Sequence, residues 1–423
     1  MRVVIEPTQH ISGAITPPGS KSCTHRALVC GALSKRAHIL NPLISRDTRA
    51  TLEAVEAMGA RVHVDDGLMV HGVAGEPKTP DDIINAQNSG TTLRLMTAIL
   101  SLAPKSSVLT GDSSLRRRPN QPLLDAMGEL GALAFSTKGD GTAPIVVCGG
   151  RRGLVGGECT IAGHISSQFI SALLMACPLA SKDSTIYVEG RMRSRPYVEL
   201  TLELLRHSGV HVEVEEDAFF VPSGQQYSLK SYTVPADFSS AGYLIAAACI
   251  TGCAIELSGL TSTTQADAKI VDIAERMGAT LSWNGDTLKV HEGCELFGIE
   301  LDCSQTPDLV PTIAAMAAHA KGKTLIKNIA HVRLKETDRI RAMACELSKM
   351  GIRCTEGKDF LEIEGGSPRR AVVQSWDDHR IAMALAVAGL TCGVEIEGAE
   401  AVDVSYPAFF DDLARLGVGV RWQ

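Results

Sequence analysis

Apolar residues recur at helical spacing in six stretches of the sequence. In each stretch the helical pattern ends at a glycine, and alternating apolar and polar residues follow. The stretches are TLEAVEAMGARVHV, LLDAMGELGALAFS, TLELLRHSGVHVEV, IVDIAERMGATLSW, MACELSKMGIRCTE and FFDDLARLGVGVRW, with glycines at Gly59, Gly131, Gly209, Gly278, Gly351 and Gly417. A glycine in this position is typical of the residue that ends an α-helix in left-handed conformation, and the alternation after it is typical of a strand. Each stretch therefore predicts a helix, a glycine cap and a strand.

The spacing of these glycines predicts an internal repeat. Successive glycines lie 72, 78, 69, 73 and 66 residues apart, so a period near 70 divides the 423-residue chain into six α/β units. Six units of this size suit two domains of three units each better than a solenoid or a single core.

Two segments are interpreted as crossings between the domains. One is the opening stretch around Pro17–Ser20, and the other is YTVPADFSSAGYLIAAACI, where a strand containing proline meets a new helix start near Asp237. These crossings predict one domain over residues 20–234 and a second that joins residues 1–19 to 235–423. A cleft between two such domains is a usual place for a ligand site.

Composition narrows the class of protein. The chain is 45% hydrophobic and 21% charged with a net charge of -7, which argues against a general nucleic-acid binder. No apolar run reaches the roughly 18 residues that span a bilayer, and MRVVIEPTQH lacks a signal-peptide core. The twelve cysteines contain no CxxC pair, so we expect reduced core thiols in a cytoplasmic protein.

The stretch PPGSKSCTHRALVCGALS gathers Lys21, Ser22 and Arg26 at a predicted helix start. It is not a P-loop, because Ser20 precedes the lysine and two prolines remove backbone donors. A helix N-terminus offers free N–H groups and a partial positive charge, and these cations strengthen the attraction for an anion. The alternative is a solvated basic helix start without a ligand.

Five further stretches share this character. They are NSGTTLRLM, LRRRP, GHISSQFISALLMACPLA, LKETDRIRAM and WDDHRIAMALAVAGL. Each alone could be a capping box or a charged surface turn. Together they predict a pocket of helix ends and cations for two phosphate or carboxylate groups. Asp308, Glu336 and His379 are candidates for proton transfer there. A metal is not expected, because no His, Cys and Asp spacing fits zinc and the cations would repel one.

These motifs resemble a known family. PGSKSCTHRAL, NSGTTLRL, LRRRP, ISSQFISALLMA, RSRPYVELTLELL, LKETDR and DDHRIAMALA occur in the order found in the 5-enolpyruvylshikimate-3-phosphate (EPSP) synthase family of enolpyruvyl transferases. The resemblance runs essentially end to end. It implies an α/β fold, a two-domain inside-out α/β barrel in which each domain has three βαβαββ units.

The resemblance also implies a reaction. Members transfer the enolpyruvyl group of phosphoenolpyruvate to the 5-hydroxyl of shikimate 3-phosphate and release phosphate. The route is addition followed by elimination through a tetrahedral intermediate, in the pathway to chorismate and the aromatic amino acids. No cofactor, metal, nucleic acid or membrane is implied, and a cytoplasmic monomer is expected. Glyphosate, the family's inhibitor, occupies the phosphoenolpyruvate position.

The family's residue roles carry over position by position. Lys21 is expected between both substrates, where it assists phosphate departure. Asp308 would take the proton from the 5-hydroxyl, and Glu336 would move protons at the methylene carbon. Shikimate 3-phosphate is expected to contact Lys21, Ser22, Arg26, Ser166, Ser167, Gln168, Ser194, Tyr197, Asp308, His331 and Lys335. Phosphoenolpyruvate is expected to contact Lys21, Gly90, Arg118, Gln168, Arg339 and Arg380.

The sequence departs from the family pattern at three places, and two rival functions stay open. NSGTTLRL differs around Gly90 from the better-known NAGTAMRP form. Val404 stands where many members have a lysine, and His331 where asparagine is frequent. The sister transferase that acts on UDP-N-acetylglucosamine would carry Lys-Asn near the start and a Cys or Asp before Arg118-Pro119. A non-catalytic anion-binding protein of the same fold would need only the cations, whereas this chain keeps Asp308 and Glu336.

Overall fold

The repeat predicted from the six glycines is present in the structure, a computed structural model that describes residues 1–261 and 264–423. All six glycines have positive φ, between 76° and 112°. Each follows a helix: α2 (Arg46–Ala57), α4 (Gln121–Glu129), α6 (Arg195–His207), α8 (Ile270–Arg276), α10 (Arg339–Lys349) or α12 (Phe409–Arg415). Each precedes a strand: β4 (Arg61–Asp65), β8 (Leu133–Ser136), β12 (Glu213–Val214), β16 (Leu281–Asn284), β20 (Arg353–Glu356) or β24 (Val420–Trp422). Every one of these strands lies at the edge of its own sheet.

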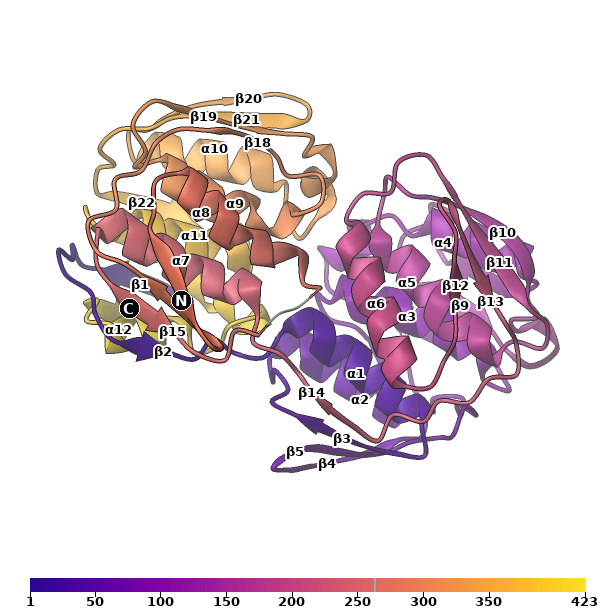
Figure 1. The fold of residues 1–423 in the computed structure, drawn as a ribbon. Helices are drawn as coiled ribbons and strands as arrows, with labels where there is room; N and C mark the ends of the chain where they lie inside the picture. The colour runs from indigo at the N-terminus through magenta and orange to yellow at the C-terminus, as the bar shows by residue number, and fades with distance from the viewer. Residues whose placement is uncertain (262–263) are drawn as a thin grey trace. The chain divides into compact units, whose positions relative to one another are not determined.

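The chain divides into two units. The central unit is Gly19–Val234, and the terminal unit is Met1–Pro18 with Pro235–Gln423. Within the described residues the strands form six four-stranded sheets, three in each unit (Figure 1). In every sheet one outer pair is parallel and the other two pairs are antiparallel, so all six repeats share one topology.

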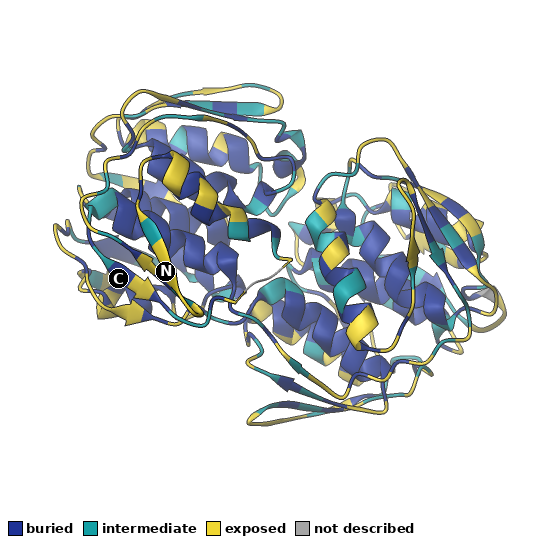
Figure 2. Cartoon of the chain, in the orientation of Figure 1, coloured by how far each residue is buried: buried dark blue, intermediate teal, exposed yellow. Residues whose placement is uncertain are grey.

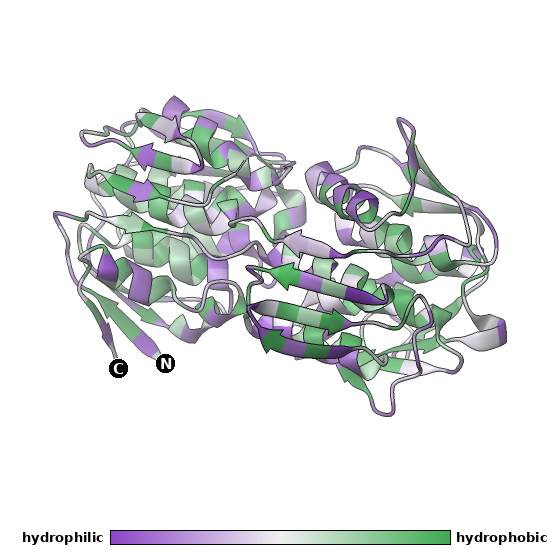
Figure 3. Cartoon of the chain, turned by 60° about the horizontal axis from the view of Figure 1, so that its bottom comes forward, coloured by the Kyte–Doolittle hydropathy of each residue, from purple (hydrophilic) through white to green (hydrophobic). Residues whose placement is uncertain are grey.

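The central unit contains three of these sheets. Besides their glycine-capped edge strands they contain β14 (Ser231–Thr233), β3 (Arg36–Leu40) and β5 (Gly67–His71); β6 (Ile84–Asn85), β7 (Ser107–Thr110) and β9 (Ile145–Cys148); and β10 (Gly157–Ala162), β11 (Ser184–Glu189) and β13 (Ala218–Val221). Residues alternate between buried and more exposed along β10 and β11. Figure 3 shows that the strands of the sheets contain both hydrophobic and hydrophilic residues. One face of each sheet therefore packs on the core.

The terminal unit contains the other three sheets. Their remaining strands are β2 (Ala14–Ile15), β15 (Ile255–Leu257) and β17 (Thr287–Val290); β18 (Glu300–Asp302), β19 (Lys323–Lys327) and β21 (Phe360–Glu364); and β22 (Ala371–Gln374), β23 (Val394–Glu397) and β1 (Arg2–Ile5). The N-terminal strand β1 pairs with both β23 and β24, so the last sheet is completed by the first residues of the chain.

The second helix type in each repeat is buried and forms the interior. These helices are α1 (Lys21–Leu33), α3 (Gly90–Ile99) and α5 (Ser167–Ala176) in the central unit, and α7 (Phe238–Thr251), α9 (Val310–Ala317) and α11 (His379–Ala388) in the terminal unit. All residues of α9 and α11 are buried, which Figure 2 shows as dark blue helices. The sheets lie outside and the apolar helices inside, because a helix that is apolar all round must be enclosed. The predicted inside-out α/β fold is confirmed.

Polar caps begin these apolar helices. Ser89, Ser166, Asp237 and Asp378 each accept a backbone N–H at the first turn of α3, α5, α7 and α11. The hydroxyls and carboxylates noted in the sequence therefore satisfy helix N-termini as N-caps. Among the described helices, none combines the length and hydropathy that spanning a bilayer requires.

Candidate active site

The residues predicted to form the site fall into two clusters, one in each unit. The central cluster contains Lys21, Ser22, Arg26, Gly90, Arg118, Ser166, Ser167, Gln168, Ser194 and Tyr197. The terminal cluster contains Asp308, His331, Lys335, Glu336, Arg339, His379 and Arg380. Their contacts with ligands stay predictions.

Arg26 is the buried cation of the central cluster, with 2% of its surface exposed. Its guanidinium donates to Thr201 Oγ1 at 2.7 Å, to Ser171 Oγ at 3.3 Å, and to the carbonyl oxygens of Ser22 and Tyr197 at 2.9 and 3.0 Å. All four acceptors are neutral. Burial lowers the pKa of Arg26, because the charged form loses its hydration. A buried cation held by neutral oxygens favours an anion nearby.

Lys21 begins α1 and makes an ion pair that sequence reasoning did not anticipate. Its Nζ lies 3.0 Å from Oδ2 of Asp47, a buried residue in the first turn of α2. The partner comes from a different helix, so no local sequence signal joins the two. The ion pair fixes the lysine ahead of the buried helix, and its side chain keeps 15% exposure.

Gly90, the first residue of α3, lies beside three polar side chains. A methyl group added there would lie 3.3 Å from Arg118 Nη1, 3.5 Å from Gln168 Oε1 and 3.6 Å from Arg94 Nη1. Glycine therefore keeps space between a helix N-terminus and two guanidinium groups. Such an arrangement suits a carboxylate or phosphate, because the helix end and the two cations all favour negative charge.

Arg94 was missed by sequence reasoning, although it lies within the motif NSGTTLRL. Its guanidinium donates to Gln168 Oε1 at 2.5 Å, Ser166 Oγ at 3.3 Å and Asn120 Oδ1 at 3.2 Å. It also lies 4.9 Å from the ring centroid of Phe169, a cation–π distance. Arg94 thereby orients two predicted ligand contacts. Its side chain turns from α3 toward α5, which the sequence alone did not indicate.

The remaining central residues begin helices α5 and α6. Ser166 caps α5 by accepting the backbone N–H of Gln168 at 3.3 Å, and Ser167 beside it is buried. Ser194 has left-handed backbone, with φ of 57°, and its carbonyl accepts the N–H of Tyr197 at 3.1 Å. These predicted contacts of shikimate 3-phosphate thus lie at the starts of two adjacent helices.

Arg339 organises the terminal cluster, and its side chain is 1% exposed. Its guanidinium donates to Asp378 Oδ2 at 2.7 Å, to Asp308 Oδ1 at 2.9 Å and to Glu336 Oε2 at 2.6 Å. Burial alone would lower the pKa of Arg339, but the three carboxylates overcome this and raise it. With a second bond to Asp378 from Nη2 at 3.3 Å, the carboxylates take four of the five N–H groups of this guanidinium.

The carboxylate of Asp308 forms ion pairs with three cationic side chains. Besides Arg339, its carboxylate contacts Arg380 Nη2 at 3.0 Å and Lys335 Nζ at 3.4 Å. The residue lies in a short 3₁₀ helix, Pro307–Leu309, directly before α9. Its negative charge is therefore stabilised by Lys335 and Arg339 from one short segment and by Arg380 from α11. Anionic substrates that engaged these cations would leave the carboxylate a stronger base.

The two predicted histidines are buried. His379 begins α11 with 1% exposure, and its Nδ1 lies 3.9 Å from Oδ1 of Asp378, beyond hydrogen-bond distance. His331 lies in the 3₁₀ helix Ala330–Leu334 and is also buried. Their roles stay predictions. Val404, which replaces the family's lysine, is buried in the 3₁₀ helix Ala399–Val404.

Asp267 is a further buried carboxylate that sequence reasoning missed. It is 2% exposed and accepts a hydrogen bond from Ser239 in the first turn of α7. Burial and the nearby Asp308 carboxylate raise its pKa to about 7, although Arg380 opposes the shift. Asp267 therefore adds a second titratable carboxyl close to Asp308.

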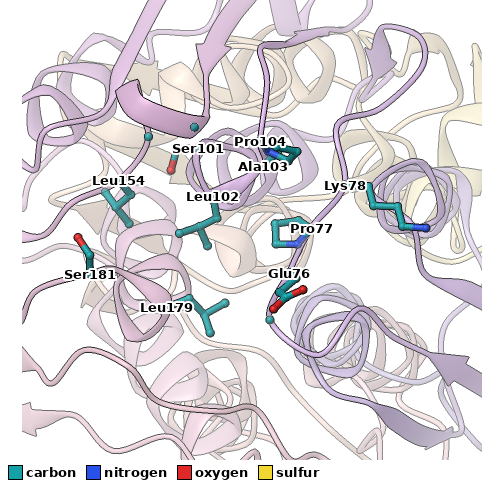
Figure 4. Close-up of a pocket in the computed structure, with 13 residues that line it drawn as sticks. Glu76, Pro77, Lys78, Ser101, Leu102, Ala103, Pro104, Leu154, Leu179 and Ser181 are labelled. Carbon is teal, nitrogen blue, oxygen red and sulfur yellow. The ribbon is translucent and has the colours of Figure 1, made fainter.

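The described part of the chain has a separate cavity and no cluster of metal-binding residues. No group of three or more His, Cys, Asp or Glu residues there is placed to hold a metal ion. A cavity of about 590 Å³ lies in the central unit, with Leu102, Leu154 and Leu179 among its lining residues (Figure 4). Its lining contains no predicted site residue. It lies beyond the C-terminal ends of α3 and α5, whose N-terminal ends carry the central cluster.

Known proteins resemble the whole chain. The family model described as EPSP synthase (3-phosphoshikimate 1-carboxyvinyltransferase) matches residues 5–413. Proteins named 3-phosphoshikimate 1-carboxyvinyltransferase from Methanococcoides burtonii and Methanothrix thermoacetophila are 50% and 51% identical to it, over 97% of each chain. The EPSP synthase structure from Acinetobacter baumannii superposes with a TM-score of 0.84 at 29% identity and covers both chains completely.

A more distant enzyme has the same fold. The enolpyruvyl transferase NikO from Streptomyces tendae superposes with a TM-score of 0.79 at 20% identity, over 99% of this chain and 98% of that one. At that identity the likeness concerns the fold alone. The family model and the two half-identical relatives confirm both the resemblance inferred from the motifs and the reaction it implied. The chain belongs to the EPSP synthase family.

Proposed function

We propose that the chain transfers the enolpyruvyl group of phosphoenolpyruvate to the 5-hydroxyl of shikimate 3-phosphate. We also propose that its two clusters have different roles in this reaction. The central cluster binds, and the terminal cluster moves protons. The observation that carries this division is that one buried guanidinium, Arg339, holds both Asp308 and Glu336, at 2.9 and 2.6 Å. Two carboxylates fixed on one rigid cation are preorganised for acid and base roles.

The addition step needs one proton removed and one supplied. Asp308 accepts the proton of the 5-hydroxyl as its oxygen bonds to the central carbon of phosphoenolpyruvate. Glu336 in its acid form gives a proton to the methylene carbon, which becomes a methyl group. The product is a tetrahedral intermediate that carries both the phosphate and the new ether oxygen.

The elimination step reverses the proton transfer at carbon. The bond from carbon to phosphate oxygen breaks with its electron pair, and Glu336 takes a proton back from the methyl group to restore the double bond. Lys21 neutralises charge on the departing phosphate. The proton that Asp308 took from the 5-hydroxyl leaves with the phosphate, so both carboxyl groups end in their starting forms, as catalysts must. No step draws on a metal or cofactor.

Binding of the anionic groups rests on the cations. Arg26 and Lys21 are proposed to attract shikimate 3-phosphate, and Arg118 beside Gly90 is proposed to meet phosphoenolpyruvate. Planar guanidinium groups match carboxylate and phosphate oxygens in two-point contacts. The neutral partners of Arg26 leave its charge available for such an anion.

The direct test is phosphate release by the purified chain. With both substrates present we expect equimolar phosphate and an enolpyruvyl ether at the 5-position, identified by NMR. Shikimate lacking its phosphate should react far more slowly, because the central cations would have no partner. UDP-N-acetylglucosamine is the control for the sister reaction. Product from that acceptor and none from shikimate 3-phosphate would overturn the proposal.

A further inference from the structure

The turn that joins β22 to α11 contains two consecutive residues in left-handed conformation. Trp376 has φ of 55° and Asp377 has φ of 54°. This region is unfavourable for residues other than glycine, and a bulky aromatic residue is rarely found there. Such a conformation persists only where surrounding contacts determine it. We therefore expect specific contacts to hold Trp376 in this conformation.

The carboxylate of Glu346 supplies these contacts. This residue of α10 is 1% exposed. Its Oε1 accepts the indole N–H of Trp376 at 2.8 Å, and its Oε2 accepts the backbone N–H of Gln374 at 3.0 Å. Lys349 Nζ balances the charge, at 2.9 and 2.7 Å from the two oxygens. One carboxylate therefore holds the last residue of β22 and the side chain of the first left-handed residue.

The same turn sets the position of the next residue, Asp378. Its carboxylate accepts the N–H of Arg380 at 2.8 Å and binds Arg339 Nε at 2.7 Å. Arg339 and Glu346 lie seven residues apart on α10, which places them on one face of the helix. Helix α10 therefore contacts the segment before α11 at two points. Arg339 binds Asp378, and Glu346 binds Trp376.

We propose that Glu346 and Trp376 are positioning residues for the reaction. They hold residues 376–377 in the left-handed turn that places Asp378, and through Asp378 they fix both Arg339 and Arg380. The inference rests on the proposed function and on the family resemblance, which implies that Arg339 and Arg380 contact phosphoenolpyruvate as well as Arg118.

The test begins with Trp376→Phe, which keeps an aromatic ring and removes the N–H. We expect kcat/KM for phosphoenolpyruvate to fall about 10-fold or more, as for loss of a hydrogen bond to a charged acceptor. The KM for shikimate 3-phosphate should change less than about 2-fold, because the proposed contacts that dominate its binding lie in the central unit. Trp283→Phe is the matched control, since Trp283 is half exposed on edge strand β16.

A rescue experiment separates positioning from general stability. Asp377→Gly makes the left-handed turn favourable without the indole contact, so the pair Trp376→Phe with Asp377→Gly should recover most of the lost kcat/KM. Ala74→Gly is the matched control, because Ala74 has φ of 53° but lies in the central unit. It relieves the same kind of backbone strain and should rescue nothing.

Three results of these experiments would overturn the inference. An unchanged kcat/KM for phosphoenolpyruvate in Trp376→Phe overturns the inference. So does an equal loss for both substrates that tracks the unfolded fraction, or a failure of Asp377→Gly to rescue. If Trp376→Phe does not fold, Glu346→Gln, which keeps one acceptor oxygen, must show the same split between the substrates. A wild-type chain that forms no product rejects the proposed function itself.

Discussion

The two units bury a guanidinium in opposite ways. In the central unit Arg26 donates to hydroxyl groups and backbone carbonyls, all of them neutral. In the terminal unit Arg339 donates to three carboxylates. Both side chains are almost fully enclosed. The repeat fold is the same, so the difference lies in the partners that the surrounding helices present.

The difference separates attraction from reactivity. A buried cation with neutral partners keeps its charge for an incoming anion, because burial weakens screening by water. A buried cation ringed by carboxylates has little charge to offer, but it fixes oxygens that accept and donate protons. This contrast has measurable consequences for turnover, stability and pH dependence.

Glu336→Gln should lower kcat by about 10²–10⁴-fold, the usual value of a general acid–base group. The amide keeps the volume and one acceptor oxygen for Arg339, so both KM values should change little. Steady-state kinetics with each substrate varied would measure this. Glu362→Gln on β21, where Glu362 pairs with Lys323 on the adjacent strand, is the control. Near-normal turnover in Glu336→Gln would remove the carboxylate from the mechanism.

Arg339→Leu should destabilise the chain more than Arg26→Leu. The first change leaves three carboxylates without their buried cation, which costs about 3–5 kcal/mol. The second leaves neutral groups unsatisfied, which costs about 1–3 kcal/mol. Urea unfolding of both variants, followed by circular dichroism, would compare them. Equal losses would show that the partners' charge does not matter and would break the contrast.

The buried titratable groups should give the two units opposite pH responses. In the central unit, burial followed by the charges of Lys21 and Arg26 lowers the pKa of His25 well below 6.5. The unfolded chain then binds a proton below pH 6.5 that the folded chain does not. Stability should fall on acidification by up to about 1.4 kcal/mol per pH unit. His25→Gln should flatten this slope, as unfolding at pH 7.5, 6.5 and 5.5 would show.

In the terminal unit the change of stability with pH has the opposite sign. The pKa of Asp267 is raised to about 7 from an ordinary value of 3.8. Between these values the folded chain holds a proton that the unfolded chain has lost, so this group's contribution to stability falls as pH rises. Asp267→Asn should therefore gain on wild type by up to about 1.4 kcal/mol per pH unit over that window. Parallel stability curves for the two proteins from pH 4.5 to 7 would contradict this.

The smallest expected effect concerns Gly90→Ala. The added methyl would lie 3.3 Å from Arg118 Nη1, so that flexible side chain must move slightly. We expect the KM for phosphoenolpyruvate to rise about 2- to 5-fold, the scale of a strained rotamer. Inhibition by the larger glyphosate molecule should weaken further. Gly128→Ala on α4 is the control, because a methyl there meets no atom within 4 Å.

The repeat and the inside-out fold could be predicted because their signals are local. Helical spacing, a capping glycine and a following strand lie within about fourteen residues, and six copies reinforce one another. Motifs such as LKETDR likewise place Lys335, Glu336 and Arg339 in one short segment. Local signals of this kind do not depend on tertiary contacts.

The partners within each cluster could not be predicted, because they come from distant segments. Asp47 with Lys21, and Asp378 with Arg339, are joined only by the packing of helices. Arg94 lay in a quoted motif but turns toward α5. The left-handed Trp376 runs against its own backbone preference, so tertiary contacts alone explain it.

Strand β1 has a consequence for synthesis on the ribosome. Val3 pairs with Ile396 and with Trp422, so its partners are made about 400 residues later along the chain. At about 5–20 residues per second, this strand waits roughly 20–80 s for them. The central unit, Gly19–Val234, is continuous and can fold during that delay. Strand β1 thus becomes ordered later than the central unit that follows it in the sequence, and it joins its sheet only after β23 and β24 have been made.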